Sequence, residues 1–124
     1  MAMTEQQRAS LVAPVQRHLA PGEQVVDVTM GARHELRRGR DRARATSVVV
    51  TDRQIVLFRR KLAGYDLSTL DLKRVIAVDQ GVGMVTGELR LTSAGGDVTR
   101  ITSVPKEDVE RVAAAIRQRL VNEP

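Results

Sequence analysis

The first part of the chain has the apolar spacing of a short helix. Four apolar residues recur at helical intervals, namely Leu11, Val12, Val15 and Leu19. Thr4, followed three residues later by Gln7, has the spacing of a capping box, and Pro14 is expected to kink the helix or to start a second turn. Ala-Pro-Gly at 20–22 ends the segment. We therefore expect residues 1–22 to form a helical appendage on a main domain of residues 23–124.

From Glu23 onward the pattern changes to the period of two that is typical of strands. Four apolar residues alternate with polar residues or glycine, namely Val26, Val28, Met30 and Ala32. Residues 35–44 lack apolar periodicity and are expected to form a basic loop. Runs rich in β-branched residues predict a hairpin of 45–51 and 54–60. Further strands are predicted near 65–69, over 74–80, and in a hairpin of 88–93 and 98–103 that turns at 94–97.

The last segment predicts one amphipathic helix. Pro105 stands in its first turn, and acidic residues near its start and basic residues near its end suit the helix dipole. Its apolar stripe is Val109, Val112, Ala113, Ile116 and Leu120. The whole order predicts a mainly β (α+β) fold, in which seven antiparallel strands form a small barrel or two packed sheets and a C-terminal helix caps the open mouth.

The composition excludes several kinds of functional site. The 124 residues suit a single domain, and the absence of cysteine excludes disulfides, thiolate nucleophiles and cysteine-ligated metals. The histidines are His18 and His34, and neither has a second histidine at metal-ligand spacing. Asp66, Asp71 and Asp79 fall at loop or solvent positions, so no set of nucleophile, base and orienting group emerges. We expect no enzyme activity, no cofactor, no metal and no small-molecule substrate.

Three glycines near the middle of the chain do not form a phosphate-binding loop. Gly81, Gly83 and Gly87 miss the G-x-G-x-x-G spacing because Thr86 occupies the last position. Bulges or a bend between two strands explain these glycines better.

The positive charge is concentrated in one window. The net charge is +5, but residues 33–61 hold ten of the twenty basic side chains and three acidic ones, so this window is +7 and the rest is −2. Such an excess attracts anionic surfaces. The candidate anion- or partner-binding residues are Arg33, Arg37, Arg38, Arg40, Arg42, Arg44, Arg59, Arg60 and Lys61. The alternative is an arginine-rich, solvated loop with no partner.

Five stretches of the sequence resemble the bacterial pleckstrin-homology (PH)-like domains, in particular the YokE-like group. They are LAPGEQVV (19–26), VVVTDRQIVLF (48–58), GYDLSTLDLKRVIAVDQG (64–81), GELRLTSAGGDVTRI (87–101) and VPKEDVERVAAAI (104–116). The most specific element is the strand–turn–strand VTDRQIVLF. The resemblance covers nearly the whole chain after residue 18 and implies a seven-stranded PH-like fold that serves as a binding or scaffolding module.

The same resemblance implies where a ligand would sit. Many eukaryotic PH domains hold phosphoinositide head groups between the first two hairpin loops, with a basic residue late in the first strand and a basic–x–Arg triplet in the second. Arg33 suits the first position and Arg42-Ala43-Arg44 matches the triplet, with Arg59, Arg60 and Lys61 expected on the same rim. This chain departs from the eukaryotic pattern because its closing helix has no Trp. Bacteria also lack the common phosphoinositides, so the same place would hold another anion or none.

Three functions remain open at the level of the sequence. The leading hypothesis is a non-catalytic adaptor whose basic rim meets an anionic membrane surface or an acidic protein. The second is a homo-oligomeric scaffold that assembles through exposed sheet edges. The third is weak, non-specific nucleic-acid binding; one Tyr, one Phe and no Trp argue against specific recognition of single strands.

The location of the protein is also predicted from the sequence. The longest apolar run, residues 112–116, is far too short for a membrane span, and the amino terminus lacks an apolar signal core. We expect a cytoplasmic protein, with the inner membrane face as a site of peripheral contact.

Overall fold

The fold is a single bent sheet with a helix on each side. The computed structural model describes residues 3–37 and 39–121, and within them seven antiparallel strands follow the order β4-β3-β2-β1-β7-β6-β5. Along the chain the elements are α1 (Glu5–Gln16), β1 (Val25–Arg37), β2 (Arg40–Thr51), β3 (Gln54–Arg60), β4 (Tyr65–Asp71), the 3-10 helix η1 (Leu72–Arg74), β5 (Val75–Val82), β6 (Thr86–Ser93), β7 (Val98–Pro105) and α2 (Lys106–Val121).

This arrangement confirms the predicted seven strands and closing helix. The sequence left a barrel and two packed sheets open. In the described part of the chain the sheet is continuous but not closed, and β4 and β5 are its edges. Pro105 ends β7 rather than standing inside α2, which is a shift of one residue from the prediction.

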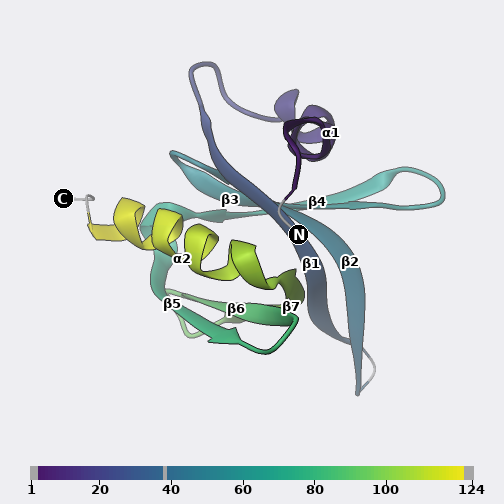
Figure 1. Cartoon of the computed structure of the whole chain (residues 1–124), viewed down its shortest axis with the longest axis vertical. Helices are drawn as coiled ribbons and strands as arrows, with labels where there is room; N and C mark the ends of the chain where they lie inside the picture. The colour runs from purple at the N-terminus through teal and green to yellow at the C-terminus, as the bar shows by residue number, and fades with distance from the viewer. Residues whose placement is uncertain (1–2, 38, 122–124) are drawn as a thin grey trace.

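The main core lies between the bent sheet and α2. Figure 1 shows α2 between the β3–β4 hairpin and the strands β5–β7. The predicted stripe of α2 is buried: Val109, Val112, Ala113 and Ile116 are 0% exposed. They pack against strand residues that include Val48, Val50 and Leu57. We call the side of β1–β4 that carries these three residues the inner face.

A second, smaller core lies on the opposite side of β1–β4, which we call the outer face. There Val15 of α1 packs with Val28, Val49 and Phe58 of the sheet. The predicted capping box is present, because the Thr4 hydroxyl accepts from the Gln7 backbone at 3.1 Å and the Gln7 side chain accepts from the Thr4 backbone at 2.9 Å. Pro14 lies within the helix. The division into residues 1–22 and 23–124 stays a prediction.

The start of β1 corrects one prediction. The four apolar residues expected on one face are split, because a register shift between Val25 and Asp27 turns the strand: Val26 packs with the inner core and Val28 with the outer core. Met30 is 45% exposed. Gly31 is where β1 crosses β7, because a Cβ there would lie 2.7 Å from the Thr102 carbonyl oxygen.

The expected basic loop over residues 35–44 is wrong. β1 runs to Arg37 and β2 starts at Arg40, so the two strands form one long hairpin with Gly39 at a positive φ of 75° in its turn. Apolar periodicity is missing because this part of the hairpin extends past the hydrophobic cores. Its backbone pairing, which needs no apolar side chains, continues to Arg37 and Arg40.

Buried charges connect β1 with both helices. Asp27 and Asp108 are 4% and 1% exposed, and Arg111 donates to both, from Nε to Asp27 Oδ2 at 2.9 Å and from Nη1 to Asp108 Oδ1 at 2.8 Å. Arg8 of α1 adds a contact of 3.2 Å to Asp27. The Thr29 hydroxyl donates to Asp108 at 2.7 Å. Two carboxylates and two guanidinium groups therefore balance in charge, as buried ions require.

A third buried carboxylate, that of Glu23, holds the turn between β2 and β3. Glu23 accepts from the Thr51 hydroxyl at 2.6 Å, from the Gln54 side chain at 2.9 Å and from the Ala20 backbone at 2.9 Å. Burial would raise the pKa of Glu23, but these hydrogen bonds outweigh it and hold that pKa below its ordinary value. The VTDRQ stretch that carried the family resemblance is thus a structural turn.

Candidate anion-binding site

The register of the β1–β2 hairpin gathers basic side chains on its inner face. Arg33 lies opposite Arg44, and Glu35 lies opposite Arg42. Directly opposite residues of an antiparallel pair point to the same side, and alternate residues of a strand share that side. The two arginines of the predicted triplet therefore join Arg33 on the face that continues from Val48. Arg44 is half-buried and Arg42 is exposed.

Arg40 and Arg37 lie at the end of this hairpin. Arg40 is exposed, and the register places it opposite Arg37. Arg38 lies outside the described residues.

The inner face continues onto the β3–β4 hairpin through Arg59. Arg59 shares the side of Leu57, and its Nη2 donates to Asp66 on β4. Arg33 reaches the same place from β1, because its Nη1 donates to Ser68 Oγ at 2.6 Å. A cavity of about 240 Å³ opens here, lined by Arg33, Glu35, Thr46, Leu57, Arg59, Asp66, Leu67 and Ser68. We call it the arginine cleft.

One atom of the cleft lacks a partner. Arg59 Nη1 is buried and has no hydrogen-bond partner within the part of the chain that the structure describes. An unpaired buried N–H group is unfavourable by about 1–3 kcal/mol, and it is satisfied when an acceptor reaches it. A phosphate oxygen is an acceptor of the kind that guanidinium groups bind best.

Asp66 is the anion that already occupies part of the cleft. The hydrogen bond from Arg59 holds the pKa of Asp66 below its ordinary value, and Lys61 Nζ lies 3.7 Å from the same carboxylate. Asp66 therefore stays ionised and competes with any external anion for Arg59.

The register separates Arg60 from the cleft, whereas Lys61 borders it through its contact with Asp66. Arg60 lies opposite Tyr65, so it falls on the outer face with Phe58, while its neighbour Arg59 falls on the inner face. Lys61 is in the turn that follows β3. Arg60 and Lys61 border a different cavity, next to α1. The single rim expected from the sequence is thus divided between two faces.

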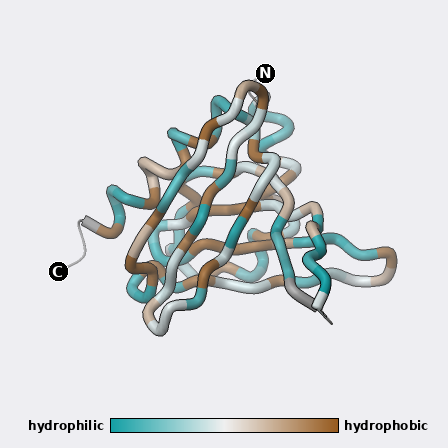
Figure 2. The backbone as a smooth tube through the Cα atoms, turned by 90° about the horizontal axis from the view of Figure 1, so that it is seen from below, coloured by the Kyte–Doolittle hydropathy of each residue, from teal (hydrophilic) through white to brown (hydrophobic). Residues whose placement is uncertain are grey.

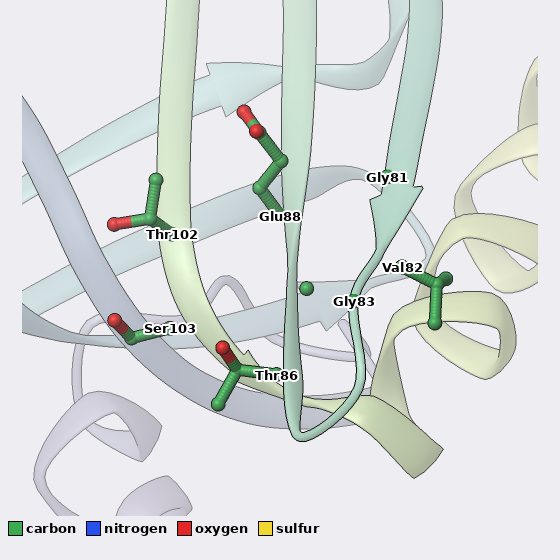
Figure 3. Close-up of a pocket in the computed structure, with 8 residues that line it drawn as sticks. Gly81, Val82, Gly83, Thr86, Glu88, Thr102 and Ser103 are labelled. Atoms are coloured by element: carbon green, nitrogen blue, oxygen red, sulfur yellow. The ribbon is translucent and has the colours of Figure 1, made fainter.

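The glycine-rich segment shapes a different hollow, where β5 ends and β6 starts. A cavity of about 430 Å³ is lined by Gly81, Val82, Gly83, Thr86, Gly87, Glu88, Thr102 and Ser103, all of which are drawn in Figure 3. The bulge expected at these glycines is confirmed for one of them, because the β6–β7 register shifts between Gly87 and Leu89. A Cβ on Gly87 would lie 2.4 Å from the Gly81 carbonyl oxygen. This hollow has no lining cation, unlike the arginine cleft.

His34 has a role that the sequence did not suggest. Its Nδ1 lies 3.0 Å from Asp41 Oδ2 on β2, and its Nε2 lies 2.8 Å from the Thr102 hydroxyl on β7. The imidazole thus joins the long hairpin to β7 on the face opposite Arg33. Nothing in the sequence brings residues 34 and 102 together, so only the register of β1 on β7 could reveal the contact.

The described residues contain no group of three or more His, Cys, Asp or Glu side chains placed to hold a metal ion. No helix among them is long and apolar enough to cross a membrane.

Comparisons with known proteins agree on the fold. The family model described as bacterial PH domain matches residues 19–118. Among solved structures, the PH domain of USP37 is 18% identical with a TM-score of 0.59, covering 77% of this chain and 98% of that one. The N-terminal PH domain of Vps36 is 20% identical with a TM-score of 0.59, covering 84% and 83%.

A third solved structure matches over more of the chain. It is the C-terminal domain of an unknown protein from Leishmania infantum, 10% identical with a TM-score of 0.64, covering 92% of this chain and 94% of that one. At such identities the structural similarity shows the fold alone. Among curated proteins, none is detectably similar in sequence.

Proposed function

This chain belongs to the bacterial PH-domain family, a family of generally non-catalytic modules that bind lipids or proteins, and from that premise we propose that its arginine cleft binds the phosphate groups of an anionic membrane surface. The protein itself acts without catalysis, as a peripheral adaptor at the inner membrane face. Its assignment to the YokE-like group stays a prediction.

The observation that carries this proposal is the unpartnered Nη1 of Arg59 in a cleft that Arg33 also lines. A planar guanidinium with two donors matches two phosphate oxygens at once, and two such groups in one cleft suit the higher charge of a phosphate. Arg42 and Arg44 extend the same face toward the end of the hairpin, where a membrane surface would approach. This continuity supports a surface carrying many phosphates rather than one small anion.

Vesicle co-sedimentation tests the proposal. We expect the protein to bind vesicles of phosphatidylglycerol and phosphatidylcholine, with an affinity that falls as NaCl rises. Each cation near an anionic surface contributes about 1 kcal/mol, so Arg42→Ala with Arg44→Ala should weaken binding about thirtyfold at low salt.

A matched control separates the cleft from net charge. Arg90 and Arg100 lie opposite each other on β6 and β7, so Arg90→Ala with Arg100→Ala removes the same charge elsewhere. We expect this control to change binding by less than about threefold, because neither arginine lines the cleft. Equal losses in the two double variants would show that charge alone acts, and an unchanged Arg42/Arg44 variant would disprove the proposal.

The two other hypotheses from the sequence stay predictions. The edges β4 and β5 are where strand addition or self-assembly would take place. Weak nucleic-acid binding would use the same arginines as the membrane hypothesis.

A further inference from the structure

The end of the β3–β4 hairpin carries a fully exposed leucine. The turn is tight, because the Lys61 backbone donates to the Gly64 carbonyl at 3.0 Å and Gly64 takes a positive φ of 92°. Leu62 in this turn has a relative exposure of 109%. Figures 1 and 2 both show the hairpin extending from the body of the molecule on the side away from the chain's C-terminus, and Figure 2 shows hydrophobic colour at its end. A fully exposed apolar side chain therefore lies in the turn of a hairpin that extends from the body of the molecule.

Cations and an aromatic ring surround the base of this turn on the outer face. Tyr65 is 41% exposed, stacks on Phe58 with ring centroids 5.4 Å apart, and has the Arg17 guanidinium 5.6 Å from its centroid. Arg17, Arg60, Lys61 and Tyr65 border one cavity of about 470 Å³ next to α1. An amphipathic ring with cations beside it suits the boundary between water and a bilayer.

We infer that the β3–β4 turn is a second membrane-contacting element, which inserts Leu62 among the acyl chains while Arg17, Arg60 and Lys61 meet lipid phosphates. The inference rests on the proposed function and adds to it a surface on the outer face, which meets the arginine cleft at Lys61, whose Nζ lies 3.7 Å from Asp66. One leucine supplies a modest apolar contact, and nearby cations supply the attraction to an anionic surface that such a contact needs.

The shape of the turn favours a bilayer over a protein partner. A stable protein interface needs a contiguous apolar patch with shape complementarity. Here one side chain projects from the end of a hairpin, and its chain neighbours are Lys61 and Ala63. A fluid bilayer surrounds such a side chain without a preformed pocket.

A second exposed apolar turn provides the contrast. Met84 and Val85, between β5 and β6, are 93% and 78% exposed. No Lys or Arg occurs in residues 80–88. Apolar exposure is therefore present at both turns, and only the β3–β4 turn combines it with positive charge.

A single-tryptophan experiment tests the inference directly, because the chain contains no Trp. Leu62→Trp and the matched Met84→Trp each place one reporter in an exposed turn. We expect the emission of Leu62→Trp to shift to shorter wavelength with phosphatidylglycerol/phosphatidylcholine vesicles and to be quenched by brominated acyl chains. Met84→Trp should show neither effect. Leu62→Ala should weaken vesicle binding about fivefold to tenfold, and Met84→Ala less than twofold.

The outcomes separate the inference from the proposed function. If Leu62→Trp co-sediments with vesicles but shows no shift and no quenching, insertion is disproved while binding by the arginine cleft stands. If both reporters shift equally, contact is not specific to the β3–β4 turn and the inference fails. If the wild type does not co-sediment with these vesicles, the proposed function fails, and the inference fails with it.

Discussion

The two ends of the β1–β2 hairpin use charged residues in opposite ways. Near the helices, Asp27 is buried and shares Arg111 with Asp108. Toward its turn, Arg40 and Arg42 are exposed. Buried charges have strict partner requirements, so the packed end uses its ions to join α1, β1 and α2. The projecting end has cations in excess, which is the condition for attracting an external anion.

The two ends of the hairpin should therefore respond differently to substitution. Changes at the packed end should lower stability and leave vesicle binding per folded molecule unchanged. Changes at the projecting end should alter vesicle binding and leave stability unchanged. Three substitutions test whether stability and vesicle binding depend on different parts of the molecule.

Removing Arg111 should be the most damaging of the three changes. Arg111→Ala leaves Asp108 without its guanidinium partner in a buried place, and we expect the free energy of unfolding to fall by about 3 kcal/mol. Urea denaturation followed by circular dichroism measures this change as a lower midpoint at an unchanged slope. Arg90→Ala, at an exposed pair 3.9 Å from Glu88, should change stability by less than about 0.5 kcal/mol. Equal effects of the two substitutions would refute the structural role of the buried network.

The pH dependence of stability should depend on Glu23. Its folded pKa is held below the ordinary value of 4.5 that it regains on unfolding, so its contribution is complete above about pH 4.5 and is lost as the pH falls through the folded pKa. Glu23→Gln should lower stability at pH 7 by about 1.5 kcal/mol, because the hydrogen bonds to a charged acceptor are lost. The same substitution should also make stability fall less steeply as the pH is lowered below about 4.5.

Urea midpoints measured between pH 7 and pH 3 test the role of Glu23. The matched control is Glu110→Gln on the exposed side of α2. A Glu23→Gln curve parallel to that of the wild type would contradict the assignment.

Removing Asp66 of β4 should strengthen vesicle binding at the arginine cleft, into which the β1–β2 hairpin reaches through Arg33. Asp66→Asn frees Arg59 from its internal anion, and one additional cation near an anionic surface corresponds to about fivefold tighter vesicle binding. Asp97→Asn, which makes the same change of charge in the β6–β7 turn, should have a smaller effect. Vesicle titration at 50 and 200 mM NaCl compares the two variants. If Asp97→Asn tightens binding as much as Asp66→Asn, the competition within the cleft does not exist.

The elements were largely predictable because their signals are local. The capping box at Thr4, the turn after Thr51 and the buried stripe of α2 each depend on residues within a few positions of one another. Residues 35–44 were misassigned for the opposite reason. Their strands are held by pairing between Arg37 and Arg40 and along the hairpin, and they bury too little to show a period.

The candidate site was predictable only in part. Arg33, Arg42 and Arg44 share a face in the structure, as their correspondence with the family pattern suggested. Their binding role stays a prediction. Arg60 was grouped with Arg59 because the two are adjacent, although adjacent residues of a strand point to opposite faces. Ser68 and Asp66 reach the cleft from β4. No local sequence pattern indicates that they meet Arg33 and Arg59 there.

The succession of strands along the chain, the closing helix and the concentration of positive charge in residues 33–61 could all be predicted from the sequence, because each is a property of neighbouring residues. The tertiary structure decided which of those cations meet in one cleft, which lie with α1 on the other face, and which charges are buried as pairs. These outcomes depend on strand register and on the crossing of β1 over β7 at Gly31, where contacts join residues about seventy positions apart. The net charge of a segment follows from its composition, whereas a binding surface forms only where the fold brings side chains to the same face.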